Sequence, residues 1–387
     1  MIGLPPTGTR THARGSRGRP LDRFLRHPGP VTTEIVHRIL HTLTAAAHRL
    51  FPVAVALVAA LVAYSVIGAA IRARWARRGR WVEIAPPAEP DEAGGLALWR
   101  MLAPLLAARR TLVGRRPPVA FECHADVSGL RVGLWVSPTM SATGVAQAVE
   151  VAWRGARATV TDPPRLPAAG TAGGRAHLAR PEWFPLASGD HTAADPIGGL
   201  LSTLVGFTAG ESAVVQILAR PAAGRRVAKA RRAARAIRRG QASTTLGRAV
   251  DLVQGRTSGG RSPASGDPLA LADVREVTAK VAAAPHFEVA IRYAVTGGSG
   301  RDATRRRRAH LRQITAALGL YAGPNHLVGR RLARAATVLG RRRLRRGFLA
   351  SAPELAALAH LPTQPASYGL PTAAARRVAP PPGVAHA

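Results

Sequence analysis

Apolar residues gather first in one long unbroken run and recur, farther along, in short alternating or helically spaced groups. The run, FPVAVALVAALVAYSVIGAAI, covers residues 51–71 and contains no charged side chain. A helix that spans a bilayer needs about 20 apolar residues, and it satisfies every backbone polar group within itself. The pattern therefore predicts a transmembrane helix over 51–71, within a longer helix from Thr33 to about residue 80 that begins with helically spaced apolar residues.

The residues that flank this run predict its orientation. Two tryptophans, Trp75 and Trp81, stand where interfacial anchors are expected. Five arginines follow the run closely: Arg72, Arg74, Arg77, Arg78 and Arg80. The positive-inside rule then places the residues from about 72 onward in the cytoplasm. A signal peptide or a buried core helix is the alternative, but the run is long, begins some 50 residues into the chain and is uncharged on all faces.

After the predicted span, the sequence contains both the alternating pattern of strands and the 3.6-residue pattern of helices, and this combination predicts an α+β fold. Strands are expected at 119–124, 130–136, 157–161, 212–218 and 286–295. Helices are expected at 96–106, 141–153, 196–207, 225–239, 269–284, 305–320 and 330–346, with Ser141 as an N-cap. Such a mixture favours helices packed on one sheet face, in a single domain or in two similar α/β subdomains.

Composition shifts along the chain predict the domain boundaries. The segments at the two ends are rich in Pro, Gly or Arg and too poor in apolar residues to form a core. In chain order we expect a disordered basic tail (1–31), the membrane helix (33–80), a linker (82–95), a first α+β subdomain (96–221), a basic helix with a loop (222–268), a second subdomain (269–361) and a Pro-rich tail (362–387).

The charge of the chain is strongly positive. The formal net charge is +34 and the isoelectric point is about 12.0. Lysine occurs only at Lys229 and Lys280, so almost all 55 basic residues are arginine. One explanation is the codon bias of a GC-rich genome, in which arginine replaces lysine everywhere. The other is an anionic partner such as nucleic acid, acidic lipid or an acidic protein.

The basic charge is concentrated in short runs, of which RRVAKARRAARAIRR at 225–239 is the longest. Its basic residues are our candidate contacts to an anionic partner: Arg225, Arg226, Lys229, Arg231, Arg232, Arg235, Arg238 and Arg239. Similar runs lie at 301–308 and 340–347. Phosphate backbones attract such runs without sequence reading, whereas the absence of aromatics within them argues against base stacking. A solvated surface or a contact with anionic lipid is an equal alternative.

Motifs that carry catalysis were not found in the sequence. Neither lysine stands in a phosphate-binding G-x-x-x-x-G-K-[ST] loop, and the glycines at 297–300 read as a surface turn. There is no G-x-S-x-G elbow, and the single Cys123 reads as a buried apolar residue. Asp190, His191 and Asp195 read as turn residues rather than metal ligands. We therefore expect no enzyme activity, no cofactor and no metal.

Three segments resemble a known family. GESAVVQILARP (210–221) and HFEVAIRYAV (286–295), with Gln216 and Arg292, resemble strands that precede the motor of actinobacterial conjugation ATPases. PELAALAHLPTQPASYGLPTAAARRVAPPP (353–382) resembles the stretch just before that motor. Over residues 80–382 the chain is thus similar to the N-terminal, non-motor region of a type IV secretion or conjugative DNA-transfer coupling ATPase.

The resemblance implies a membrane-anchored, non-catalytic accessory or targeting module of such a DNA-transfer system. The ATPase domain of that family has no counterpart here, so we expect a natural split protein or a truncated reading frame. The alternatives are a subunit of a split ATP-driven translocase, whose motor is a separate chain, and a structural membrane-surface protein. A motor subunit, DNA, anionic lipid and further copies of this chain stay open as partners.

Overall fold

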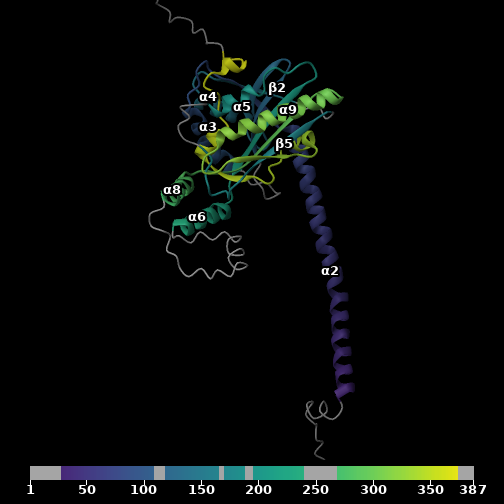
Figure 1. Cartoon of the computed structure of the whole chain (residues 1–387). Helices are drawn as coiled ribbons and strands as arrows, with labels where there is room; N and C mark the ends of the chain where they lie inside the picture. Colours follow the sequence, from purple (N-terminus) through teal and green to yellow (C-terminus); the bar gives the residue numbers. More distant parts are fainter. Residues whose placement is uncertain (1–27, 109–117, 165–169, 188–194, 239–267, 374–387) are drawn as a thin grey trace, which may run out of the picture. The chain divides into compact units, whose positions relative to one another are not determined.

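The computed structural model describes residues 28–108, 118–164, 170–187, 195–238 and 268–373 (Figure 1). The chain divides into two compact units, 1–69 and 70–387. Most of the predicted basic tail (1–31) and the end of the Pro-rich tail (374–387) lie outside the described residues, as does Arg239.

The apolar run lies in one helix, as predicted. Helix α2 extends over Pro28–Arg78. From Phe51 to Arg78 it is long and apolar enough to cross a membrane, and only 6% of its most apolar stretch is buried. Since a core helix of a soluble domain would be mostly buried, this exposure argues against that alternative.

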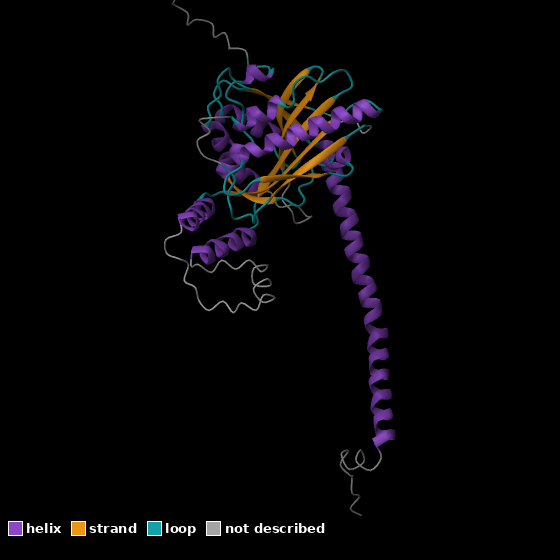
Figure 2. Cartoon of the chain, in the orientation of Figure 1, coloured by secondary structure: helices purple, strands orange, loops and turns teal. Residues whose placement is uncertain are grey.

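The second unit is built on a single antiparallel sheet (Figure 2). Its nine described strands are β1 (Arg80–Ala85), β2 (Val119–Asp126), β3 (Gly129–Val136), β4 (Arg157–Thr161), β5 (Ala172–Leu178), β6 (Ser212–Pro221), β7 (His286–Thr296), β8 (Leu327–Arg331) and β9 (Phe348–Ser351). Their order is β4-β1-β3-β2-β6-β7-β5-β8, and β9 pairs with one end of β7. The α+β class is confirmed, but β6 and β7 join the two expected subdomains into one sheet.

Helices cover the sheet unequally. The described helices after α2 are α3 (Ala93–Ala108), α4 (Ala142–Ala152), α5 (Pro196–Ser202), α6 (Gly224–Arg238), α8 (Pro268–Ala282), α9 (Arg301–Ala317), α10 (Ala335–Gly340) and α11 (Ala352–Leu358), with short 3-10 turns at Leu318–Tyr321 and Pro365–Tyr368. Helices α3, α4, α5, α9 and α11 bury one face in the main core. Helix α10 and residues 341–347 pack on the other face, and α6 packs against α8 (Figure 1).

Strand alternation explains which residues form the main core. On β7, Phe287, Val289, Ile291 and Tyr293 all lie in that core, as the sequence predicted. On β2 the odd positions, such as Phe121 and the free thiol Cys123, do the same. Neighbouring even positions point to the opposite face, because successive strand residues alternate.

The predicted linker at 82–95 is wrong at its start. Residues 80–85 form β1, which pairs with β3 on one side and β4 on the other. Trp81 is fully buried rather than an interfacial anchor, and Val82 and Ile84 enter the main core. The short alternation of this strand was not recognised in the sequence, because the arginines before it are typical of the end of a membrane helix.

The predicted basic helix at 330–346 is also wrong. It is replaced by the end of β8, the short α10, a turn and the approach to β9. Arg334 and Arg342 have positive φ angles of 53° and 43°, which a continuous helix does not permit. The sequence did not predict strand β5, because Gly173 and Gly174 are typical of a loop. Glycine is required at 173 by close packing instead, since a Cβ there would lie only 2.5 Å from the Cβ of Ala335 on α10.

Candidate anion-binding surfaces

Helix α6 carries the basic residues that the sequence singled out. Val227, Ala234 and Ile237 are half-buried and Ala230 is buried, so a narrow apolar stripe packs the helix against α8. Six of the eight candidate residues are exposed: Arg225, Lys229, Arg231, Arg232, Arg235 and Arg238. Helix α6 thus presents a basic surface.

Arg226, by contrast, is engaged within the protein. Its Nε donates to the two carboxylate oxygens of Glu182 at 3.1 and 3.0 Å, and its Nη1 lies 3.3 Å from Glu288 Oε1. Arg220 also donates to Glu288, from Nε at 2.9 Å. Arg226 therefore anchors α6 to the end of the sheet, and among the described candidates it is the least available to an outside anion.

Helix α9 presents a second basic surface with a regular geometry. Arg301, Arg305, Arg308 and Arg312 follow the spacing i, i+4, i+7, i+11, which places all four on one side of the helix. All four are exposed. At about 1.5 Å rise per residue, the stripe is roughly 16 Å long.

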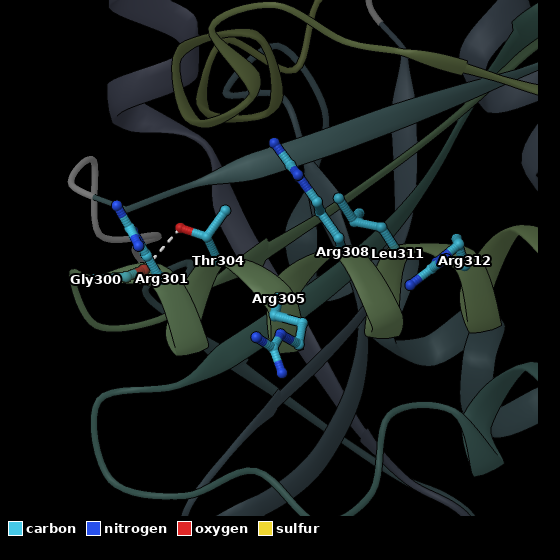
Figure 3. Close-up of a pocket in the computed structure, with 7 residues that line it drawn as sticks. All are labelled: Gly300, Arg301, Thr304, Arg305, Arg308, Leu311 and Arg312. Carbon is cyan, nitrogen blue, oxygen red and sulfur yellow. Dashed lines mark hydrogen bonds between the residues drawn. The ribbon is translucent and has the colours of Figure 1, made fainter.

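The stripe lines an open groove of about 890 Å³ (Figure 3). Gly300, Thr304 and Leu311 complete its lining, and no aromatic side chain is among the lining residues. Among the described residues, Asp302 is the acid that pairs with the stripe: its carboxylate lies 3.9 Å from Arg305, and both side chains are 82% exposed. Solvent screens such a pair strongly, so the groove keeps its positive potential.

The other side of α9 holds the helix on the sheet. Arg306 Nε donates to Glu211 at 2.9 Å, and Arg307 donates to the carbonyl oxygen of Gly297 at 3.1 Å. Thr315 and Tyr293 share a hydrogen bond of 2.7 Å, while Ile314 is fully buried. These contacts divide the RRRR run, since Arg306 and Arg307 are engaged internally and their neighbours face solvent.

The geometry suits a phosphate chain better than a base. Guanidinium groups bind phosphate oxygens through charge-assisted, often bidentate hydrogen bonds. Without aromatic platforms, the groove offers no stacking for unpaired bases. The sequence pointed to the run at 301–308 but not to Arg312, which extends the stripe; the helical spacing of these four arginines was the signal that identifies the set.

The opposite face of the sheet carries a buried polar cluster. Arg342 donates to both oxygens of Glu122, at 2.7 and 3.0 Å, and Gln216 Nε2 donates to Glu122 Oε1 at 2.8 Å. His124 Nε2 lies 3.0 Å from Glu122 Oε2 and its ring stands edge-on to Trp81. Burial alone would raise the pKa of Glu122, but Arg342 and the His124 and Arg342 hydrogen bonds outweigh it and hold the pKa well below its usual range.

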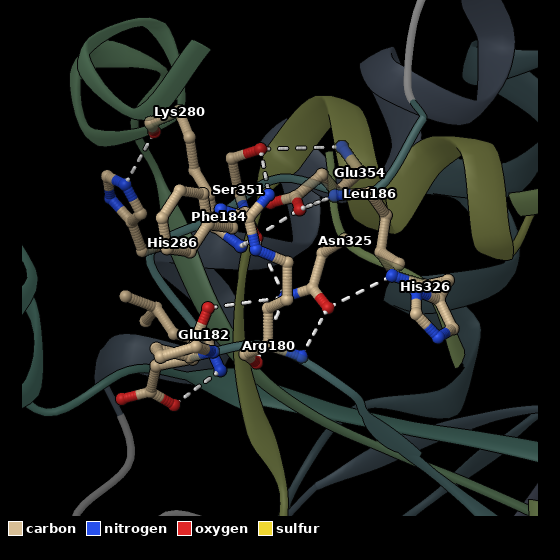
Figure 4. A network of polar contacts seen from close by, with 12 residues as sticks. Arg180, Glu182, Phe184, Leu186, Lys280, His286, Asn325, His326, Ser351 and Glu354 are labelled. Atoms are coloured by element: carbon tan, nitrogen blue, oxygen red, sulfur yellow. Dashed lines mark hydrogen bonds and ion pairs between the residues drawn. The ribbon is translucent and has the colours of Figure 1, made fainter. Parts of the chain in front are cut away.

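A second buried network joins α8, α11 and the segment after β5 (Figure 4). Lys280 Nζ lies 2.9 Å from Glu354 Oε1, and both side chains are only 1% exposed. Glu354 also accepts from the backbone nitrogens of Leu186 at 2.8 Å and Ser351 at 2.7 Å, the second as part of a capping box. These contacts are internal to the fold and tie α8, α11 and the segment after β5 together.

The described residues contain no cluster of three or more His, Cys, Asp or Glu that could hold a metal ion. Asp195 instead caps α5 through Ile197 N at 3.1 Å, as a turn residue would, and its other oxygen accepts from Thr363 N at 3.0 Å. Asp190 and His191 lie outside the described residues.

A family profile described as a domain of unknown function (DUF8128) matches residues 70–367. The chain belongs to the DUF8128 family. The DUF8128 domain contains every strand of the sheet, both basic helices and both buried networks, whereas residues 51–69 of the apolar run precede it. No curated protein matches the chain.

Proposed function

We propose that this chain is a membrane-anchored, non-catalytic module that holds nucleic acid at the membrane, as an accessory of a type IV secretion or conjugative DNA-transfer system. The observation that carries the proposal is the stripe of four exposed arginines along the groove of α9. The apolar helix supplies the anchor. The assignment to DNA transfer draws on the resemblance of the strands with Gln216 and Arg292, which lie directly opposite each other on β6 and β7.

Nucleic acid is favoured over lipid by the shape of the surface. The four arginines form a single line about 16 Å long on one side of α9, whereas a bilayer presents a two-dimensional field of headgroups. A linear array matches the backbone of a duplex, in which phosphates on each strand recur at about 3.4 Å of helix rise. Binding is therefore tolerant of sequence.

We further propose that the DUF8128 domain lies in the cytoplasm, because the cluster of arginines after the apolar run favours that orientation under the positive-inside rule. A C-terminal reporter that is active only in the cytoplasm is expected to be active when fused to the full chain. Activity of an exported-only reporter at the same position would refute this orientation and, with it, access to cytoplasmic nucleic acid.

The binding test uses the full chain in neutral detergent, offered either a mixed-sequence duplex or vesicles rich in anionic lipid. We expect duplex binding that falls when Arg301, Arg305, Arg308 and Arg312 are all changed to Gln. The matched control changes Arg231, Arg232, Arg235 and Arg238 on α6 to Gln, removing the same charge. Binding to vesicles but not to the duplex at low salt would refute the nucleic-acid proposal and favour a membrane-surface protein.

A second candidate function is a subunit of a split translocase with a separate motor chain. It rests on the same resemblance and on the lack of a phosphate-binding loop in the sequence. ATP turnover that appears only when a co-encoded motor is mixed with this chain would favour it over a purely accessory role. Homo-oligomer formation is compatible with both.

A further inference from the structure

Three arginines face one another across the sheet, on the face opposite α9. Arg330 on β8 pairs with Arg175 on β5, and Arg175 pairs with Arg292 on β7. Directly opposed residues of antiparallel strands lie on the same face with their Cβ atoms about 4.5–5.5 Å apart, and like charges there repel. Arg345, from the segment that crosses this face, adds a fourth charge close enough to act on Arg292.

Arg292 is unusual among the buried arginines of the described chain. Two are buried, and Arg342 is paired with Glu122. Arg292 is only 5% exposed, yet its recorded hydrogen bonds go to the carbonyl oxygens of Val338 and Arg343, not to a carboxylate. Burial, followed by Arg175 and Arg345, lowers the pKa of Arg292 to about 10.

A histidine adds an unsatisfied polar atom to this cluster. His177 lies two residues after Arg175 on β5, hence on the same face, and its Nδ1 is buried without a hydrogen-bond partner. Burial and the nearby Arg330 and Arg175 lower its pKa, which favours the neutral ring. A neutral imidazole can still donate one N–H to an oxygen.

We propose that Arg175, Arg330 and Arg345, backed by Arg292 and His177, form a binding site for a single phosphate group on the face opposite the α9 groove. Arg330 and Arg345 are exposed and Arg175 is half-buried, so their guanidinium groups are accessible from solvent. The guanidinium group of Arg292 is buried and donates to two carbonyl oxygens, so it contributes positive charge to the site rather than a direct contact. Among the described residues, no acid forms an ion pair with these arginines. A bound anion would offset their mutual repulsion, and guanidinium forks match phosphate oxygens.

The test measures the melting temperature of the full chain in neutral detergent as inorganic phosphate replaces chloride at constant ionic strength. A ligand that binds only the folded state raises this temperature. We expect a phosphate-dependent rise, and a loss of phosphate affinity of at least about tenfold when Arg175 and Arg345 are changed to Gln. The control changes Arg154 and Arg157, exposed near the far edge of the sheet, to Gln and should keep the rise.

Parallel arms with glycerol phosphate and a short duplex identify the source of the phosphate group, a lipid headgroup or a nucleic-acid backbone. The α9 stripe variant should keep the inorganic-phosphate effect, so this site can stand if the nucleic-acid proposal fails. No stabilisation beyond that in chloride would overturn the site. So would a variant that simply becomes more stable, with the same phosphate response as the native chain, because the arginines would then only repel one another.

Discussion

Changing Glu122 to Leu should destabilise the DUF8128 domain by about 3–5 kcal/mol, because it leaves a buried guanidinium without its acid. Arg342 is 8% exposed and loses both hydrogen bonds to the carboxylate, while Gln216 loses one. Chemical unfolding of the full chain in detergent, followed by tryptophan fluorescence, measures the change, since Trp81 and Trp135 border this cluster.

The matched control is the double variant Glu122→Leu with Arg342→Leu, which removes both charges. Replacing a buried ion pair by apolar groups is often nearly neutral, so the double variant should regain most of the lost stability. A double variant as unstable as Glu122→Leu alone would show that the pair does not account for the loss.

The pH dependence of this cluster has a defined sign. Because the pKa of Glu122 is lowered in the folded state, its contribution is present above the pKa of the unfolded chain and is lost as pH falls through the folded value. The stability gap between native and Glu122→Gln should therefore stay constant near neutral pH and close only in strong acid. A gap that closes near neutral pH would contradict the lowered pKa.

Changing Glu354 to Leu should have an effect of similar size, about 3–5 kcal/mol. It leaves the Lys280 ammonium buried, with Phe184 O at 3.3 Å as its remaining contact, and it removes the acceptor for Leu186 N and Ser351 N. Lys280→Met should cost less, because the Glu354 carboxylate keeps the donors from Leu186 and Ser351.

The informative outcome is which of the two variants, Glu354→Leu or Lys280→Met, loses more stability. Denaturant midpoints give this order when the two unfolding curves have equal slopes. If Lys280→Met proved more damaging than Glu354→Leu, the carboxylate would depend on the ammonium rather than on its backbone donors. Neither change should alter duplex binding by protein that remains folded, since both residues lie in the buried network and not in the α9 groove.

Local patterns predicted those elements whose signal is complete within a few residues. The unbroken apolar run identified α2, Ser141 caps α4 through Gly144 N as expected, and the alternation in 286–295 identified β7 and its core face. The single sheet was not predictable, because pairing of β6 with β7 joins segments about 70 residues apart and depends on tertiary register.

The candidate anion-binding surfaces were also only partly predictable from the sequence. Basic runs reveal charge but not which arginines are engaged internally: Arg226, Arg306 and Arg342 are bound by Glu182, Glu211 and Glu122, all distant in sequence. The row formed by Arg330, Arg175 and Arg292 likewise exists only through strand register. The sequence alone therefore indicates a basic protein, and the structure shows which arginines are paired with acids of the same chain.

The measurement that tests the central claim most directly is the salt dependence of duplex binding by the full chain and by its α9 variant. Each phosphate contact contributes a slope of about −0.9 in log K against log salt concentration. Changing Arg301, Arg305, Arg308 and Arg312 to Gln should therefore flatten the slope by up to about 3 to 4 units, with little loss of stability because these charges are exposed. An unchanged slope in this variant, or flattening only in the α6 control, would contradict the assignment of nucleic-acid binding to α9.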